Sequence, residues 1–322
     1  MQYRTISGTD VKISTVSLGC WTLGGLQYNE GRMIGWREVD EKDATRAVHA
    51  AVDAGVNHFD NADVYGYGRA ERLLTLALRG VRKKVVVATK IGYFRGTAEH
   101  AYMPHHIRTQ CEHSLINLKK DCLDIYYLHN TDFGPKDRYL DGAVETLHRL
   151  REEGKIRLIG LSGGPEGLLR TLRRVKPDLI QSRASMMDRR ILEDSPAVRL
   201  IKRMKLQVVC FSPLEQGILL GKYSAKKPPQ FEDGDVRKQR EAFTARGLRK
   251  VEGRIEKLKV RFGSSTEEMA AAAVSFLLAY DHVLCAIPGF RNAQQVKCNT
   301  ACGGVSMGAG DAEFVRGLFP AG

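Results

Sequence analysis

Residues 58–66 read HFDNADVYG, and this stretch decides how the rest of the chain is interpreted. A short apolar run that is typical of a strand end precedes it, and YGRAE at 67–71 indicates a loop that enters a helix. Asp60 and Tyr65 are therefore expected where a strand gives way to a loop, the usual place for chemistry in a barrel of alternating strands and helices. Tyrosine has a free pKa of about 10, and a neighbouring cation would make its proton easier to donate.

The pattern of strand, loop and helix repeats along the whole chain. Residues 85–89, VVVAT, are uncharged and mostly β-branched, as a strand buried on both faces should be. Asp40 and Gly55 are typical of the start and stop of a helix between them. Strands are expected at 16–20, 56–59, 85–89, 123–128, 156–160, 179–181, 206–211 and 282–287. Helices are expected at 40–54, 69–78, 104–118, 141–152, 165–175, 195–204, 266–279 and 311–318, and also in the stretch that follows the polar segment at about 222–246 and ends at 261.

Eight such strands with no linker between them predict a single (β/α)8 TIM barrel over residues 1–322. The alternative is a doubly wound open sheet, which would normally carry Gly-x-Gly-x-x-Gly after its first strand if it bound a dinucleotide. The stretch GCWTLGG at 19–25 does not fit that spacing. A polar segment at about 222–246 follows the seventh strand and is too long for an ordinary connection, so we expect a functional loop or lid there.

The composition excludes several classes of protein. Hydrophobic residues make up 43% and charged residues 27% of the 322 residues, which is ordinary for a globular protein. No apolar run approaches the length of a membrane-spanning helix, and the first residues, MQYRT, lack the apolar core of a signal peptide. Seven cysteines without metal-binding spacing favour reduced thiols. A cytoplasmic location is the resulting expectation.

The formal net charge of +13 could attract nucleic acid or an anionic ligand. The basic residues are spread along the chain and form no compact nucleic-acid motif. His100, His105 and His106 fall in one loop, but no carboxylate is spaced to complete a metal site with them. The expected partner is therefore a small molecule, with no metal, nucleic acid or membrane, and an anionic or polyhydroxylated substrate follows if these histidines face the pocket.

Four polar groups carry the candidate chemistry. Asp60 and Tyr65 follow the second expected strand, Lys90 ends the third, and His129 ends the fourth. In a barrel these ends open on one face, so Lys90 would lower the pKa of the Tyr65 phenol and Asp60 would hold Lys90 in place. His129 could then hydrogen-bond a substrate oxygen. Each residue alone also fits an ordinary structural role, and the catalytic interpretation depends on their joint placement.

Six motifs occur in an order that resembles the aldo-keto reductases, and the similarity runs from about Tyr3 to the end of the chain. The motifs are FDxAxxYG at 59–66, ATK at 88–90, DIYYLHxxD at 124–132, GLS at 160–162, FSPLxQGxLxGKY at 211–223 and IPGxR at 287–291. The resemblance implies a (β/α)8 barrel that uses NADPH to reduce an aldehyde or ketone to an alcohol. It also implies Tyr65 as general acid, with Lys90, Asp60 and His129 in support.

The same resemblance implies a set of cofactor-binding residues. Phe211 would stack on the nicotinamide, Arg291 would bind the 2′-phosphate of NADPH or NADP+, and Gly289 would allow close approach of the backbone. The remaining cofactor residues are Trp21 and Asp60, Ser162 and Gln181 at the carboxamide, Ser212, Leu214, Gln216, Gly217 and Lys222 at the pyrophosphate, and Gln295 and Asn299 at the adenine. Trp21, Tyr93 and Phe94 are the expected walls of the substrate pocket.

Two departures from the family pattern bear on the cofactor. Gly163 follows Ser162 where the family often has asparagine, and Ala184 stands where the family often has an aromatic residue. Two other functions stay open on the sequence alone. One is a cofactor-binding regulatory subunit with little turnover, and the other is a sugar or polyol dehydrogenase that works in the oxidative direction.

Overall fold

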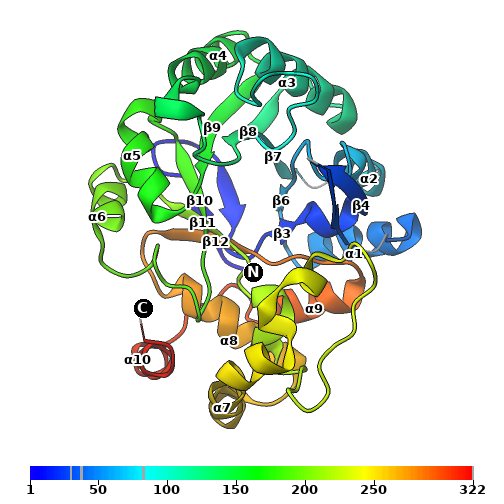
Figure 1. Ribbon diagram of the computed structural model, residues 1–322, viewed down its shortest axis with the longest axis vertical. Coiled ribbons are helices and arrows are strands. Elements are labelled where there is room, and N and C mark those ends of the chain that lie inside the picture. Colours follow the sequence, from blue (N-terminus) through cyan, green and yellow to red (C-terminus); the bar gives the residue numbers. More distant parts are fainter. Residues whose placement is uncertain (30, 37–38, 82–83, 321–322) are drawn as a thin grey trace.

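Eight parallel strands form a ring at the centre of the molecule, surrounded by helices (Figure 1). The computed structural model describes residues 1–29, 31–36, 39–81 and 84–320. Neighbours in the ring follow the order β12-β11-β10-β9-β8-β7-β6-β3, so consecutive strands lie side by side. The strands are β3 (Leu18–Gly19), β6 (His58–Asp60), β7 (Val86–Ile91), β8 (Leu123–Leu128), β9 (Ile156–Ser162), β10 (Leu179–Arg183), β11 (Val208–Phe211) and β12 (Val283–Ile287).

The first and last strands bring the ring almost to closure. The backbone N–H of Ser17 donates to the carbonyl of Ala286 at 2.9 Å, and that of Gly19 donates to Pro288 at 3.0 Å. Isolated parallel bridges join Val16 to Ala286 and Gly19 to Gly289. The predicted (β/α)8 barrel is therefore confirmed, and the open-sheet alternative is wrong.

The helices cover the outside of the ring because each carries one apolar face. In α1 (Glu41–Asp53) the side chain of Asp40 accepts hydrogen bonds from the N–H groups of Lys42 and Asp43, as its predicted role of N-cap requires. The other long helices are α2 (Arg69–Ala77), α3 (Pro104–Leu118), α4 (Leu140–Glu152), α5 (Pro165–Val175), α6 (Pro196–Arg203), α7 (Ala245–Phe262), α8 (Thr266–Leu278), α9 (Ala293–Thr300) and α10 (Ala309–Leu318). No helix in these described ranges is both long and apolar enough to cross a membrane.

Several element boundaries differ from those expected. The first strand is shorter, because Cys20–Leu23 form a 3-10 helix at the strand end. Strand β7 continues to Ile91, so Lys90 lies within the strand rather than after it. Two antiparallel hairpins were not predicted, β1 (Tyr3–Thr5) with β2 (Lys12–Ser14) and β4 (Leu26–Asn29) with β5 (Arg32–Gly35).

The first of these hairpins closes the amino-terminal end of the barrel. Ile6 and Ile13 are fully buried and pack in one cluster with Ile125 of β8 and Leu179 of β10. The apolar side chains between the strands are therefore shielded from water at that end. The predicted site residues belong to the opposite end of the barrel, where the strands lead into loops.

Segment 222–246 folds across the mouth of the barrel toward the second hairpin. The guanidinium of Arg237 lies 4.2 Å from the ring centre of Phe231 and 4.9 Å from that of Trp36, which follows β5. Gly234 approaches Leu26 so closely that a Cβ there would meet its side chain at 2.9 Å. The segment thus bridges two parts of the chain that are about 200 residues apart in sequence.

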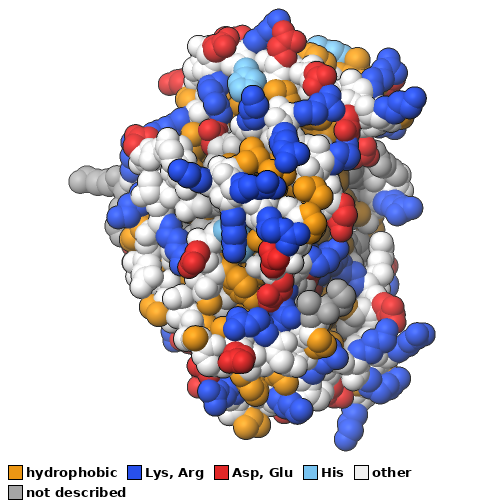
Figure 2. Space-filling view, turned by 90° about the vertical axis from the view of Figure 1, so that its left-hand side faces the viewer, with side chains coloured by type: hydrophobic (Ala, Val, Ile, Leu, Met, Phe, Trp, Pro, Cys, Tyr) orange, Lys and Arg blue, Asp and Glu red, His pale blue; other side chains and the backbone are white. Residues whose placement is uncertain are grey.

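The basic residues are distributed over the surface. Figure 2 shows Lys and Arg side chains over the whole of one face, with Asp and Glu among them. On α5 and α6, Arg174 pairs with Asp141 at 2.7 Å and Arg199 pairs with Asp194 at 2.5 Å. Exposed pairs of this kind contribute little to stability, and this face is consistent with a solvated arginine-rich surface.

Candidate active site

A buried lysine connects the first two predicted catalytic residues. The Lys90 ammonium donates to Asp60 Oδ2 at 2.5 Å, to the carbonyl of Asn61 at 2.6 Å and to the Tyr65 phenol oxygen at 3.4 Å. Lys90 is fully buried and Asp60 is 2% exposed. A buried charge of either sign is costly without its partner, so this pair fixes the ammonium beneath the phenol.

Strand register explains why these residues meet. In the parallel pair of β6 and β7, Asp60 lies opposite Ala88. Side chains two apart on a strand share a face, so Lys90 lies one step beyond Asp60 on the same side of the sheet. The Lys90–Asp60 pair is therefore built on two neighbouring strand ends, whereas Tyr65 lies in the loop after β6.

The loop that carries Tyr65 depends on a glycine. Gly66 has φ of +61°, and its N–H donates a hydrogen bond to the side-chain oxygen of Gln27. A Cβ at this position would lie 2.0 Å from the carbonyl oxygen of Gly24, so another residue would force the loop away. Trp21 stacks on the Tyr65 ring with the ring centres 6.2 Å apart.

The Tyr65 side chain is held in its neutral, protonated form. Burial, followed by the nearby Asp60 carboxylate, raises the pKa of Tyr65 well above its ordinary value. The expectation that Lys90 gives this phenol a lowered pKa is wrong, because desolvation disfavours the phenolate more than the ammonium favours it. The hydroxyl therefore keeps its proton at neutral pH and can act as a donor.

His129 completes the group in its neutral form. Burial and the Lys90 ammonium lower the pKa of His129 well below its ordinary value. Its ring centre is 5.8 Å from that of Tyr65 and 4.5 Å from that of Tyr93. Its Nδ1 has no hydrogen-bond partner among the described residues. A neutral imidazole in this place can form a hydrogen bond to an oxygen that Tyr65 protonates.

Two of the three predicted pocket walls lie beside this group. Trp21 and Tyr93 contact Tyr65 and His129, and Tyr93 is 48% exposed at the rim. Phe94 packs edge-on against Tyr67, with the ring centres 5.4 Å apart, and its place in the substrate pocket stays a prediction. Trp36, which the sequence reasoning did not single out, meets Trp21 edge to face at 5.5 Å.

The predicted carboxamide residues lie side by side on adjacent strands. Ser162 at the end of β9 is paired in register with Gln181 on β10, and both are buried. The Gln181 amide donates to Asp60 Oδ1 at 2.8 Å, so it also anchors the catalytic carboxylate. Phe211 ends β11 and is partly exposed, as a stacking ring would need to be.

The segment after β11 forms a backbone cradle beside an unpaired cation. Ser212, Gln216 and Gly217 have left-handed φ values of +59°, +54° and +99°. The Lys222 side chain packs against Gly217, and burial together with Arg237 lowers the pKa of Lys222. No carboxylate of the described chain pairs with Lys222, so an anion would be stabilised there. These features fit a pyrophosphate.

The far end of the predicted cofactor site lies after β12. Gly289 approaches Thr22, where a Cβ would be 3.4 Å from its methyl group. Arg291 is close enough to Asp235 of segment 222–246 to lower the pKa of that carboxyl. Gln295 is exposed on the first turn of α9, whereas Asn299 is buried and donates to the Gly289 carbonyl at 2.9 Å. Asn299 therefore helps to hold the loop, and Gln295 is the more exposed of the two predicted adenine residues.

The two departures from the family pattern have different structural settings. A Cβ at Gly163 would meet the Thr131 methyl group at 2.7 Å, so Thr131 occupies the space that a larger residue would need. Ala184 is fully buried and its N–H donates to the Phe211 carbonyl at 3.1 Å. Thr131 thus explains why glycine is tolerated at 163, whereas nothing comparable compensates for the small side chain at 184.

The three histidines expected in one loop divide between that loop and α3, because His100 precedes the helix and His105 and His106 lie in its first turn. His106 Nε2 lies 2.8 Å from the Phe94 carbonyl, and His100 stacks on Tyr139 with ring centres 4.4 Å apart. Across the described ranges, no three side chains of His, Cys, Asp or Glu gather in a metal-binding arrangement. These rings therefore shape the loop.

Other residues that support the site have no obvious signal in the sequence. The Arg69 guanidinium donates to the carbonyl of Leu23 at 2.5 Å and to that of Val39 at 3.1 Å. These bonds connect the start of α2, just after the Tyr65 loop, to the stretch between β3 and α1. Glu215 is 8% exposed and accepts hydrogen bonds from Arg183 and from Ser185. Charged residues in a polar stretch of sequence are usually exposed. Only the structure shows that Glu215 is buried and that Arg69 and Glu215 connect neighbouring segments through hydrogen bonds.

A barrel with a tyrosine, a lysine, an aspartate and a histidine at the carboxyl ends of its strands defines a class of oxidoreductase. The model of the aldo/keto reductase family matches residues 15–306. The chain belongs to the aldo/keto reductase family.

Curated relatives share about a quarter of their residues with this chain. The aldo-keto reductase YhdN of Bacillus subtilis is 27% identical, covering 99% of this chain and 94% of the relative. An L-galactose dehydrogenase of Arabidopsis thaliana is also 27% identical, covering 85% of this chain and 83% of its own.

Solved structures of the family superpose along nearly the whole chain. A glycerol dehydrogenase of Gluconobacter oxydans is 28% identical with a TM-score of 0.80, covering 98% of this chain and 94% of its own. An aldo-keto reductase of Bacillus halodurans, solved in its holo form, is 25% identical with a TM-score of 0.76, covering 100% and 97%.

Proposed function

We propose that this protein reduces an aldehyde or ketone to the alcohol with NADPH, and that Tyr65 is the general acid. The contact that carries the proposal is the buried Lys90 ammonium, 2.5 Å from Asp60 and 3.4 Å from the Tyr65 phenol. Bound NADPH would supply the hydride that the carbonyl carbon receives. Tyr65 then gives its proton to the carbonyl oxygen, and the Lys90 ammonium stabilises the phenolate that is left.

His129 and the pocket walls orient the carbonyl group. The neutral imidazole donates a hydrogen bond to the same oxygen that Tyr65 protonates, which fixes that oxygen between the two rings. Trp21 and Tyr93 exclude water around it from opposite sides. The carbonyl carbon is thereby presented to the side of the pocket on which Ser162, Gln181 and Phe211 would hold the nicotinamide.

The preference for NADPH over NADH rests on Arg291, because only the 2′-phosphate distinguishes the two cofactors. Lys222 and the 212–217 backbone would hold the pyrophosphate, and Arg291 the 2′-phosphate, since guanidinium groups bind phosphate with charge-assisted hydrogen bonds. Arg291 lies near Asp235 and is therefore not an isolated charge. Arg291→Ala should weaken NADPH binding by about tenfold or more and leave NADH binding unchanged in a fluorescence titration. Equal losses for both cofactors would remove the 2′-phosphate role.

Tyr65→Phe tests the proton donor. This variant should bind NADPH as the wild type does, since the ring that packs on Trp21 is retained. Its carbonyl reduction should fall by about 100-fold to 10,000-fold, the usual contribution of a general acid. Turnover equal to the wild type would remove Tyr65 from the mechanism.

A second candidate function is oxidation of a sugar or polyol. Two relatives described above are named for alcohol oxidation, one for glycerol and one for L-galactose. The same four side chains serve both directions, with Tyr65 then accepting a proton. Rates with glycerol and L-galactose plus NADP+, compared with rates on the matching aldehydes plus NADPH, distinguish the two candidates. Negligible turnover in both directions would favour a regulatory subunit instead.

We further propose that the protein works in the cytoplasm. All seven of its cysteines are free thiols, five of them buried, as suits a reducing compartment. Fractionation of cells that express the tagged chain tests the location directly, and recovery with an extracellular or membrane fraction would contradict it.

A further inference from the structure

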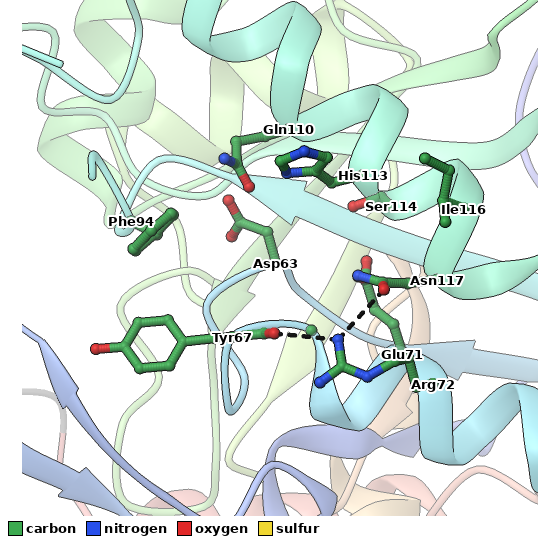
Figure 3. A pocket seen from close by; sticks show the side chains of 11 residues that line it. Asp63, Tyr67, Glu71, Arg72, Phe94, Gln110, His113, Ser114, Ile116 and Asn117 are labelled. Atoms are coloured by element: carbon green, nitrogen blue, oxygen red, sulfur yellow. Dashed lines mark hydrogen bonds between the residues drawn. The ribbon is translucent and has the colours of Figure 1, made fainter. Parts of the chain in front are cut away.

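A second hollow lies outside the barrel, between α2 and α3 and behind the loop that carries Tyr65. It has a volume of about 340 Å³ and is lined by side chains of both helices and of the loops after β6 and β7 (Figure 3). Tyr65, Lys90 and His129 do not line it. The hollow is therefore separate from the site described above.

Two buried acids with unequal surroundings line this hollow. Glu71 is fully buried, and its two oxygens accept hydrogen bonds from Thr89 at 2.6 Å and from Asn117 at 2.9 Å. Asp63 is 6% exposed, and its Oδ1 accepts from the N–H of Val64 at 2.6 Å. Its Oδ2 is enclosed and has no partner within the described part of the chain. Buried carboxylates are normally satisfied, so the Asp63 carboxylate has hydrogen-bonding capacity that the described chain does not use.

A hydroxyl group on α3 is also left without a partner. Ser114 is fully buried, lines the hollow, and its Oγ has no hydrogen-bond partner among the residues that are described. Figure 3 shows the Asp63 carboxylate directed toward Gln110 on the same helix. The Asp63 carboxylate and the Gln110 amide thus lie beside each other in the lining, and Ser114 Oγ is enclosed.

The charges and rings around this hollow favour a cation. Burial and the neighbouring Glu71 carboxylate raise the pKa of Asp63 well above its ordinary value, and a positive charge would relieve both effects. Tyr67 and Phe94, whose ring centres are 5.4 Å apart, supply aromatic faces that attract cations. The Arg72 guanidinium lies at the other end, where it donates to the Tyr67 carbonyl at 3.3 Å and to Asn117 at 3.2 Å.

We propose that this hollow binds a small organic ammonium or guanidinium ion. The Asp63 carboxylate is its counter-ion, the Gln110 amide oxygen accepts one of its remaining N–H groups, and Tyr67 and Phe94 cover its carbon atoms. The volume exceeds that of a bare metal ion, and across the described residues no metal-binding group of three ligands forms. Charge-assisted hydrogen bonds of this kind are the strong ones.

Titration calorimetry of the full chain, without added cofactor or carbonyl, tests the site. The probes are n-butylammonium, n-butanol and butyrate at one ionic strength, so that chain length is constant and only the charge changes. Butylammonium should bind saturably, and Asp63→Asn should weaken it by about tenfold or more. The exposed Asp53→Asn is the matched control and should bind as the wild type does. Butyrate binding that depends on Asp63, or unchanged butylammonium binding in Asp63→Asn, overturns the proposal.

Further variants keep the test decisive and separate it from the proposed reductase function. If Asp63→Asn does not fold, Phe94→Leu should weaken butylammonium by about threefold or more through loss of one aromatic face, and unchanged affinity overturns the proposal. Tyr65→Phe should bind butylammonium like the wild type, whatever its catalytic defect, and a loss there would assign the ion to the active site instead. Displacement of butylammonium by sodium or magnesium at matched ionic strength would indicate an inorganic cation site and also overturn the proposal.

Discussion

At the scale of single residues, chemistry in this protein depends on what burial does to ionisable groups. Lys90 and Asp60 stay together under the Tyr65 phenol, and burial keeps both Tyr65 and His129 uncharged. The identities of all four groups could be predicted from motif spacing. The direction of the Tyr65 pKa could not, because sequence gives the neighbours of a phenol along the chain but not how little water reaches it.

Lys90→Met separates the two roles of the lysine. We expect turnover to fall by about 100-fold to 10,000-fold, since the phenolate formed on proton transfer loses its cation. The free energy of unfolding should also fall, by about 3–5 kcal/mol, because Asp60 becomes a buried and unpaired charge. Steady-state kinetics and urea denaturation measure the two effects.

The double variant Asp60→Asn/Lys90→Met is the control for that experiment. It should regain most of the stability, since no unpaired charge is left, while turnover stays low. Recovery of turnover in the double variant would show that the ammonium is dispensable for the reaction.

At the scale of elements, the alternating strands and helices of the barrel could be predicted from the sequence, whereas the two short hairpins could not. Residues 104–118 and 165–175 form helices within the expected bounds, because proline at the first helical position and regular apolar spacing mark them clearly. The hairpins β1–β2 and β4–β5 have strands of only three or four residues, too short to establish an alternating pattern. The direction of a loop side chain such as Phe94 likewise has no periodicity to reveal it.

Arg237 should control how firmly segment 222–246 is held. Its guanidinium lies over Phe231 and Trp36, and each such contact is worth about 1 kcal/mol. Arg237→Ala should therefore make chymotryptic cleavage within 222–246 roughly 30-fold faster, since the two contacts together are worth about 2 kcal/mol. Added NADPH should protect the wild-type segment, because the segment lies over the proposed pyrophosphate and 2′-phosphate residues.

The adjacent Lys238→Ala is the control for the proteolysis experiment. Lys238 is exposed and pairs only with Asp233 among the described residues, so its loss should leave cleavage unchanged. Equal cleavage of wild type with and without NADPH would argue against closure of the segment over the cofactor.

At the scale of the whole molecule, the barrel buries a histidine that its mechanism does not use. His58 is fully buried on β6, and neither ring nitrogen has a partner in the described chain. Burial lowers the pKa of His58 from 6.5 to about 4. Below pH 6.5 the unfolded chain binds a proton that the folded protein does not, so stability falls as the pH falls toward 4.

His58→Leu tests this dependence. The histidine should cost the wild type about 3 kcal/mol of unfolding free energy between pH 7 and pH 4, and the leucine variant should lose that much less over the same range. Urea denaturation at several pH values gives both curves. Parallel curves for the two proteins would show that His58 does not titrate on unfolding.

Closure of the ring between its first and last strands has a consequence for synthesis on the ribosome. Strand β3 is made early, but its second neighbour, β12, begins only at Val283. Until the ribosome has released the chain beyond that point, β3 and β11 each expose an unpaired edge, and exposed edges of this kind pair with other chains. Nascent or truncated chains that stop before β12 should therefore need chaperones to avoid aggregation, although all four proposed catalytic residues have been synthesised by then.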